Sequence, residues 1–201
     1  MSKKVTAFTE VLLIKNKSLI ARLKFKSELK ENAKRNINLI RNMGKKVLIL
    51  SGDSQKAVKR VASELGIEED SAICCALPED KLKIINEMSA SRPTMIGDGV
   101  NDSAALSAAY IGIGVRGGVE ATLKSSDVYI STGRIDEITN CFIGAKKTKA
   151  LIMRNFTISV LYNVIGGSLA LMGLMHPLLA AILMPISSLS IIASSLFSRT
   201  F

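Results

Sequence analysis

Two long runs without a charged residue, near the end of the chain, constrain its fold more than any other feature. They cover residues 156–175 and 178–197, and only His176 and Pro177 separate them. A helix of about 20 apolar residues crosses a bilayer core of roughly 30 Å. The runs therefore predict a two-helix transmembrane hairpin within residues 151–201. A buried helical pair in a soluble protein is the alternative, and the length and the lack of charge disfavour it.

Basic residues flank the two runs on one side. Those before the first run and after the second are Lys146, Lys147, Lys149, Arg154 and Arg199. Because Lys and Arg favour the cytoplasmic side of a membrane, both ends of the hairpin are expected there. The start of the chain, MSKKVTAFTE, lacks the apolar stretch of a secretory signal. We therefore expect an integral protein of the cell or inner membrane, with residues 1–150 and both chain ends in the cytoplasm.

The net charge of +10 comes from one segment. Residues 1–46 hold 13 Lys and Arg against 3 Asp and Glu, and the rest of the chain holds 14 of each. Few aromatic residues accompany these charges, which are spaced as on a solvated helix face, so no nucleic-acid partner is expected. The three cysteines, Cys74, Cys75 and Cys141, form no CxxC pattern, which fits a reducing compartment.

Residues 1–150 alternate short apolar runs with helical patterns. A hairpin is predicted from residues 11–14 and 19–23, strands at 46–50, 73–77, 94–97, 111–115 and 127–130, and helices at 26–43, 55–65, 79–88, 102–109 and 118–124. Strands that alternate with helices predict an α/β, Rossmann-like domain whose parallel sheet is covered on both faces. From Ile135 the helical pattern continues without a breaker into the first apolar run.

Polar residues follow three of the predicted strands. The segments are Ser51-Gly52-Asp53, Pro78-Glu79-Asp80-Lys81 and Gly97-Asp98-Gly99-Val100-Asn101-Asp102. In doubly wound sheets ligands bind at the carboxyl ends of the strands, so these segments are expected to share a site. Each has a plainer interpretation alone: a turn with an N-cap, a solvated lysine, or a loop whose Asp caps a helix. Their occurrence at successive strand ends favours the site.

The residue types in these segments suit Mg²⁺ and phosphate. Asp98 and Asp102 place two carboxylates on one loop, and such hard oxygen ligands suit Mg²⁺, which keeps several waters. The Ser51 hydroxyl and the N–H groups of its turn are predicted to hold phosphate oxygens. Lys81, at a helix start, is suited to neutralise phosphoryl charge. Gly97 and Gly99 allow close approach of backbone to a ligand.

The sequence GDGVNDSAAL resembles the hinge signature of P-type ATPases, within the haloacid dehalogenase-like (HAD-like) phosphotransferase fold. SGD is similar to the TGD of that family, and PEDK to its strand-end lysine motif. The resemblance implies that Asp98 and Asp102 serve Mg²⁺, Ser51 and Lys81 the phosphoryl group, and Asn101 the hinge geometry. It also implies that Gly52, Asp53, Gly97 and Gly99 surround the cofactor, and that ATP is bound mainly by a domain outside this chain.

The apolar runs contain polar residues similar to a pattern of the heavy-metal-transporting subclass, in its copper branch. These are Tyr162 and Asn163 in the first run, and Met184 and Ser188 in the second. A thioether is a soft ligand suited to Cu(I), and polar groups in hydrocarbon usually face a pathway. The resemblance therefore implies Cu(I) as the transported ion. Packing of Met184 and ordinary helix contacts of Ser187 and Ser188 are the alternatives.

The DKTGT motif, whose Asp is phosphorylated in P-type ATPases, does not occur in these 201 residues. We therefore expect the chain to be inactive alone and to work with a complementary N-terminal half of an ATP-driven pump. A truncated, non-catalytic membrane remnant or a regulator of an intact pump is the alternative. A membrane-tethered phosphatase is disfavoured, because enzymes of this fold type need the aspartate.

Overall fold

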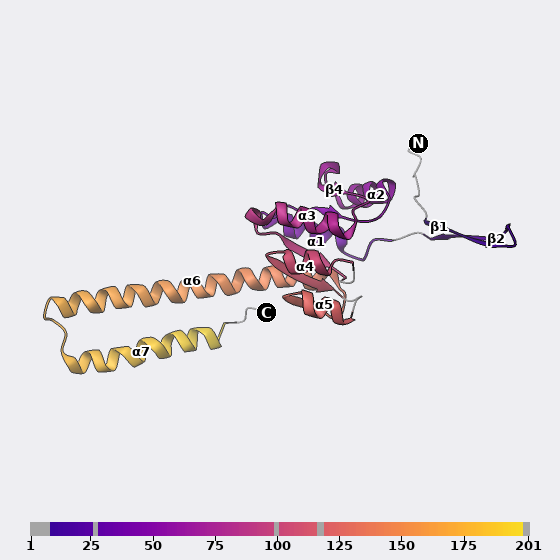
Figure 1. The fold of residues 1–201 in the computed structure, drawn as a ribbon. Helices are drawn as coiled ribbons and strands as arrows, with labels where there is room; N and C mark the ends of the chain where they lie inside the picture. Colours follow the sequence, from indigo (N-terminus) through magenta and orange to yellow (C-terminus); the bar gives the residue numbers. More distant parts are fainter. Residues whose placement is uncertain (1–8, 26–27, 99–100, 116–118, 199–201) are drawn as a thin grey trace. The chain divides into compact units, whose positions relative to one another are not determined.

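The computed structural model describes residues 9–25, 28–98, 101–115 and 119–198. The chain divides into two compact units, Met1–Thr139 and Asn140–Phe201. Figure 1 shows the elements of both units, which are described below one at a time.

The predicted hairpin at the start of the first unit is confirmed. Strand β1 (Thr9–Lys15) pairs antiparallel with β2 (Ser18–Phe25). The loop between them consists of Asn16 and Lys17, with φ of 50° and 65°. Positive φ at both central residues defines the hairpin turn whose twist matches that of the strands. Apolar side chains along both strands, from Val11 to Leu23, are about half exposed.

The rest of the first unit alternates helices and short strands. In chain order these are α1 (Ala33–Asn42), β3 (Ile49–Leu50), α2 (Gln55–Leu65), β4 (Ala72–Ile73), α3 (Pro78–Glu87), β5 (Thr94–Gly97), α4 (Ser103–Ala108), β6 (Ile111–Val115), α5 (Val119–Ser125) and β7 (Val128–Ile130). Two 3-10 turns, Glu69–Ser71 and Ser89–Ser91, precede β4 and β5. The predicted α/β class is confirmed.

The strands that follow the hairpin, β3 to β7, pair in parallel, as predicted, but they form two sheets. One sheet has the order β3-β4 and the other β5-β6-β7. Strands β5 and β6 match their predicted bounds, whereas β3 and β4 are much shorter than the predicted runs 46–50 and 73–77. β4 ends early because Cys75 has a φ of 54°, a left-handed conformation that no strand accepts.

Helix α1 corrects the predicted helix 26–43. It begins only at Ala33, because Asn32 has a φ of 61° and breaks the helical path. Its predicted end is right, since Gly44 follows with a φ of 78°. Helix α2 matches its predicted bounds and ends at Gly66, whose φ of 72° is the left-handed conformation that commonly closes helices.

Two apolar clusters hold the α/β elements together. The first surrounds Ala62, whose side chain is fully buried, and packs α1 against α2 and the start of α6. Beside it, buried Asn36 donates a 2.9 Å hydrogen bond to the Asp136 carboxylate. The second cluster packs Ile85 of α3 against Met95 of β5 and residues of α4. This second cluster packs α3, the helix that carries Lys81, against β5.

The second unit is a helical hairpin. Helix α6 (Ile135–Leu171) begins in the first unit and runs on without a break, as predicted, and α7 (Pro177–Leu196) runs back beside it (Figure 1). The connection spans five residues rather than the predicted two, because α6 ends at Leu171 and Gly173 has a φ of 72°. Asn155 accepts a 3.0 Å hydrogen bond from Ser194 and donates one of 3.2 Å to Ser195.

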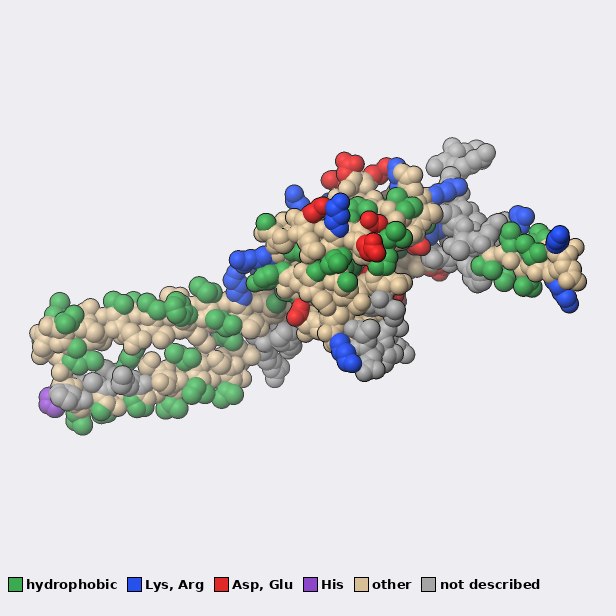
Figure 2. Space-filling view, viewed as in Figure 1, with side chains coloured by type: hydrophobic (Ala, Val, Ile, Leu, Met, Phe, Trp, Pro, Cys, Tyr) green, Lys and Arg blue, Asp and Glu red, His purple; other side chains and the backbone are tan. Residues whose placement is uncertain are grey.

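Apolar side chains cover much of the hairpin surface visible in Figure 2. Examples are Phe156, Leu161 and Leu189, all more than half exposed. Within the residues that the structure describes, no helix combines the length and the apolar character needed to cross a membrane.

Candidate functional site

An ion pair joins two of the three predicted site segments. The Lys81 ammonium, on the first turn of α3, lies 2.7 Å from Asp102 Oδ1, at the start of α4. Both side chains are only 12% exposed. A charge so shielded from water is costly unless it is paired, so each residue requires the other in this arrangement. The pair connects the segment that follows β4 with the loop that follows β5.

Gly97 makes room for the Asp102 carboxylate. A Cβ atom at position 97 would lie 2.7 Å from Asp102 Oδ2 and 2.9 Å from its Cβ, too close for any side chain. Asp102 also caps α4, because its carbonyl accepts a 2.8 Å hydrogen bond from the Leu106 amide. The carboxylate is therefore fixed by a lysine on one side and by strand backbone on the other.

Asp98 lies directly after β5, and its carboxylate is exposed. Among the described residues this carboxylate has no hydrogen-bond or ion-pair partner, so it remains available to a ligand. Asn101, on the turn before α4, is also exposed. Gly99 lies outside the described residues, so its predicted part in the site stays a prediction.

The segment Ser51–Asp53 is joined to the segment after β4. The Ser51 hydroxyl accepts a 3.1 Å hydrogen bond from the Asp53 amide. The Ala76 amide donates to the Ser51 carbonyl at 3.0 Å, and the Cys75 amide to the Asp53 carbonyl at 2.9 Å. Gly52 lies between them, where a Cβ would be 3.4 Å from the Ala76 carbonyl oxygen. In the described part of the chain no hydrogen bond or ion pair joins this segment to Lys81 or Asp102.

The site offers oxygen ligands that suit Mg²⁺, but the described part of the protein does not supply a complete set of ligands. Asp98 offers a free carboxylate, and Asp102 offers one in the space that Gly97 leaves. The described residues hold no group of three or more His, Cys, Asp or Glu side chains placed to bind a metal. Two carboxylates suffice for Mg²⁺ when waters and phosphate oxygens complete its octahedron. The arrangement can therefore hold Mg²⁺ with a phosphorylated group.

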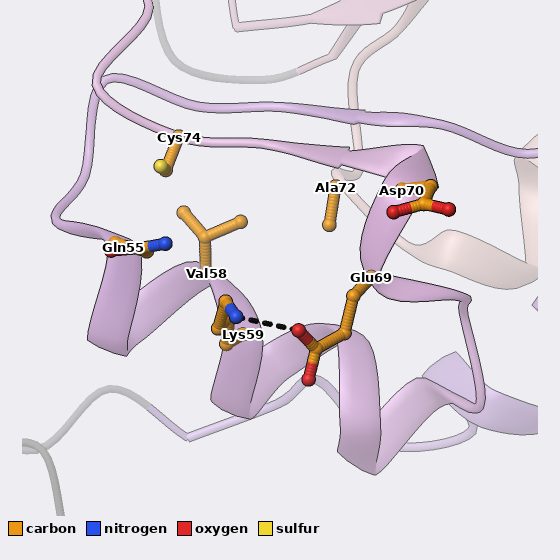
Figure 3. A pocket seen from close by; sticks show the side chains of 7 residues that line it. All are labelled: Gln55, Val58, Lys59, Glu69, Asp70, Ala72 and Cys74. Atoms are coloured by element: carbon orange, nitrogen blue, oxygen red, sulfur yellow. Dashed lines mark hydrogen bonds and ion pairs between the residues drawn. The ribbon is translucent and has the colours of Figure 1, made fainter.

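A shallow pocket of about 220 Å³ lies elsewhere on the same unit (Figure 3). Its lining residues are Gln55, Val58, Lys59, Glu69, Asp70, Ala72 and Cys74. Across it Lys59 donates a 2.5 Å hydrogen bond to Glu69, and this bond raises the pKa of Lys59 above its ordinary value. None of the predicted site residues lines this pocket, so we assign it no part in the site.

The predicted ion ligands lie on the two hairpin helices. Tyr162 is half-buried and Asn163 exposed on α6, and the Asn163 amide donates a 2.9 Å hydrogen bond to the Ser159 carbonyl one turn earlier. Ser188 is exposed on α7, and the side chain of Met184 lies outside the described residues. The structure therefore places these residues on neighbouring helices but brings no described pair of them into contact.

One contact of the site was missed by the sequence reasoning. Thr122 of α5, whose side chain is fully buried, donates a 3.0 Å hydrogen bond to the Asp98 carbonyl. The two residues are 24 positions apart in the sequence, and no local motif predicts the contact.

Comparisons with known proteins identify the family of the chain. A family model described as haloacid dehalogenase-like hydrolase matches residues 2–109. The chain is 32% identical over 191 residues to the nitrogen fixation protein FixI of Rhizobium leguminosarum bv. viciae, covering 94% of the chain and 25% of that protein. It is also 32% identical over 190 residues to a copper-exporting P-type ATPase of Staphylococcus aureus (strain MRSA252), covering 94% and 23%.

A solved structure extends the likeness to the fold. The crystal structure of a zinc-transporting PIB-type ATPase in the E2.Pi state matches with a TM-score of 0.82 and 28% identity, over 94% of this chain and 31% of that chain. The chain spans about a quarter of the length of the curated relatives described above. Since the family model covers more than half of the chain, this protein belongs to the haloacid dehalogenase-like hydrolases, and its relatives include a copper-exporting P-type ATPase and a zinc-transporting PIB-type ATPase.

Proposed function

We propose that this chain is part of an ATP-driven pump for heavy-metal cations, in which it supplies Mg²⁺- and phosphate-binding loops and two membrane helices. The observation that carries the proposal is the shielded Lys81–Asp102 ion pair beside the free carboxylate of Asp98. The three groups follow the carboxyl ends of β4 and β5, and such folds bind ligands at the carboxyl ends of their strands. The P-type ATPases among the relatives supply the reaction class.

Each group has a role that follows from its chemistry. Asp98 and Asp102 would hold Mg²⁺, which neutralises phosphate charge when bound. Lys81 would neutralise negative charge on the phosphoryl group during its transfer. Its own ammonium group is largely shielded from water. Ser51, with the turn formed by Gly52 and Asp53, offers a hydroxyl and amides to phosphate oxygens.

The nucleophile has to come from elsewhere, because the DKTGT motif does not occur in the sequence. We propose that a complementary half of the pump provides it, together with most of the ATP site. Two features support such a partner. Among the described strands β3 and β5 each have one unpaired edge, as do β4 and β7, and a further strand can add at such an edge. The β1–β2 ribbon exposes apolar side chains that a second sheet or helix would cover.

Phosphorylation tests the proposal. The purified chain alone is expected to form no acid-stable phosphoenzyme from [γ-³²P]ATP, because no other group replaces the missing aspartate. Joined with a separately expressed half that carries DKTGT, it should give a labelled band at the mass of that half. Asp98→Asn should lower the label more than about 100-fold, beyond the loss typical of residues that only orient a ligand.

The control is Asp70→Asn, which removes an exposed carboxylate of the same unit outside the predicted site. It should leave the label unchanged. If Asp98→Asn and Asp70→Asn reduce the labelling equally, Asp98 has no specific role in the site. Wild-type complex that never becomes labelled would instead favour a non-catalytic remnant or a regulator of an intact pump.

We further propose that the α6–α7 hairpin lies in the membrane, with both chain ends in the cytoplasm. Its exposed side chains are largely apolar, and the exposed Lys146, Lys147, Lys149 and Arg154 precede the apolar part. Such basic residues favour the cytoplasmic side. Since 94% of the chain aligns with the zinc-transporting ATPase, most of residues 140–201 must belong to that alignment.

Membrane flotation after an alkaline carbonate wash tests the placement of the hairpin. The wild-type chain should float with the lipid. Leu161→Asp with Leu189→Asp should shift it to the soluble or aggregated fractions, because one buried Asp costs about 2.5 to 3.5 kcal/mol at the centre of a spanning helix. The control Leu123→Asp alters a leucine of the α/β unit that is also about half exposed, and it should still float. Release of the wild type by carbonate alone would contradict the proposal.

The transported ion is proposed to be Cu(I), bound in part by the Met184 thioether. Tyr162, Asn163 and Ser188 add oxygen donors on the two helices. Of these donors the thioether is the one that selects a soft cation. The copper-exporting relative from Staphylococcus aureus supports this choice, whereas the solved relative transports zinc.

Competition with a Cu(I) chelator, in the reconstituted complex, tests the ion. Met184→Leu should weaken Cu(I) binding at least about tenfold, while the change in packing stays below about 1.5 kcal/mol. Met153→Leu, at an exposed position of α6, is the matched control and should bind as the wild type does. Equal affinity of all three proteins would mean that Met184 only packs.

A further inference from the structure

The hydrogen bond from Thr122 to Asp98 is a polar contact of the proposed Mg²⁺-binding loop that none of the predicted motifs contains. The donor is the Thr122 hydroxyl and the acceptor is the Asp98 main-chain carbonyl, 3.0 Å away. Thr122 is 0% exposed. A buried helical threonine commonly donates to a carbonyl three or four residues earlier in its own helix. Here the hydroxyl instead reaches a loop that follows a strand.

Neighbouring residues hold Thr122 from two further sides. Its carbonyl accepts a 2.6 Å hydrogen bond from the Ser126 hydroxyl. Its methyl group fills the space above Gly114, where a Cβ atom would lie only 2.5 Å from Thr122 Cγ2. These contacts hold the threonine in place independently of Asp98. It therefore has little freedom to follow the loop if the loop moves.

The position of Gly114 links this threonine to the strand that carries the site. Gly114 of β6 is in register with Gly97 of β5, the residue that precedes Asp98. Gly97 leaves room for the Asp102 carboxylate, and Gly114 leaves room for Thr122. Two paired glycines at the carboxyl ends of neighbouring strands thus admit the two side chains that fix the loop, one at each end of the segment from Asp98 to Asp102.

We propose that Thr122 is a positioning residue for Mg²⁺, which orients the Asp98 carboxylate by holding the main-chain carbonyl of the same residue. This inference rests on the proposed function of Asp98. A hydrogen bond to the carbonyl fixes the peptide plane after Asp98 and so limits where its exposed carboxylate points. Groups that orient a metal ligand from behind typically change metal affinity 10- to 100-fold when they are removed.

Binding of Mn²⁺, which accepts the same oxygen ligands as Mg²⁺ and is detected by electron paramagnetic resonance, tests this role in the full chain. Thr122→Val keeps the shape of the side chain and removes the hydroxyl, and it should weaken Mn²⁺ binding about tenfold. Thr122→Ser keeps the hydroxyl and should bind nearly as the wild type does. A structural role alone would not predict this rescue, because serine loses the methyl group that packs on Gly114.

The matched control is Thr139→Val. Thr139 is 2% exposed, and its hydroxyl has no hydrogen-bond partner among the described residues. The same substitution there should leave Mn²⁺ affinity unchanged. If Thr122→Val does not fold, judged by circular dichroism, Thr122→Ala takes its place and the same tenfold loss is expected.

Asp98→Asn separates the two possible failures. If the wild type binds Mn²⁺ no better than Asp98→Asn, the proposed Mg²⁺ site itself is wrong and the role of Thr122 falls with it. If Asp98→Asn loses binding but Thr122→Val matches the wild type, the site stands and the positioning role is overturned. Loss in both Thr122→Val and Thr122→Ser would also overturn it, because the methyl group rather than the hydroxyl would then matter.

Discussion

The ion pair between Lys81 and Asp102 is the interaction on which the rest of the site depends. It connects the helix after β4 with the loop after β5, and so bridges two sheets between which the described residues form no strand pairing. Both charges are largely shielded from water, where an unpaired charge is costly and a paired one is tolerated. The apolar contact of α3 with β5 and α4 sets the distance, and the absence of a side chain at Gly97 lets the carboxylate reach the lysine.

Open strand edges bear on the proposed function of this pair. Among the described strands β3 and β5 each lack a neighbour on one side, as do β4 and β7, and the chain continues from β3 into Ser51 and from β5 into Asp98. A parallel strand added at the open edge of β3 or β5 would bring its own carboxyl end next to Ser51 or Asp98, where the proposed phosphoryl transfer requires a nucleophilic aspartate. The proposed pump partner would account for three features together: the open strand edges, the lack of DKTGT in these 201 residues and the exposed apolar side chains of the β1–β2 ribbon. All three follow if the chain is the part of a pump that receives the phosphorylated aspartate from a partner.

Local patterns predicted the elements whose signals are local, and they failed where tertiary contacts decide. Helical periodicity followed by Gly66 predicted the end of α2 correctly. Short apolar runs predicted β5 and β6 with the observed bounds. Asn32 and Cys75 adopt left-handed conformations that cannot be predicted from their residue types. The predicted helix 26–43 and the predicted strand 73–77 were therefore longer than the observed α1 and β4. The Lys81 and Asp102 motifs were found, although their direct contact was not. Thr122 was missed because its partner lies 24 residues away.

A double-mutant cycle on the ion pair measures the central interaction directly. The unfolding free energy of the full chain, followed by circular dichroism in urea without Mg²⁺, would be compared for the wild type, Lys81→Met, Asp102→Asn and the double variant. Each single change leaves one shielded charge unpaired, so the effects should not add. The account predicts a coupling energy of about 1 to 3 kcal/mol, the upper range for residues in contact. Additive effects within about 0.3 kcal/mol would contradict it, because the two groups would then not depend on each other.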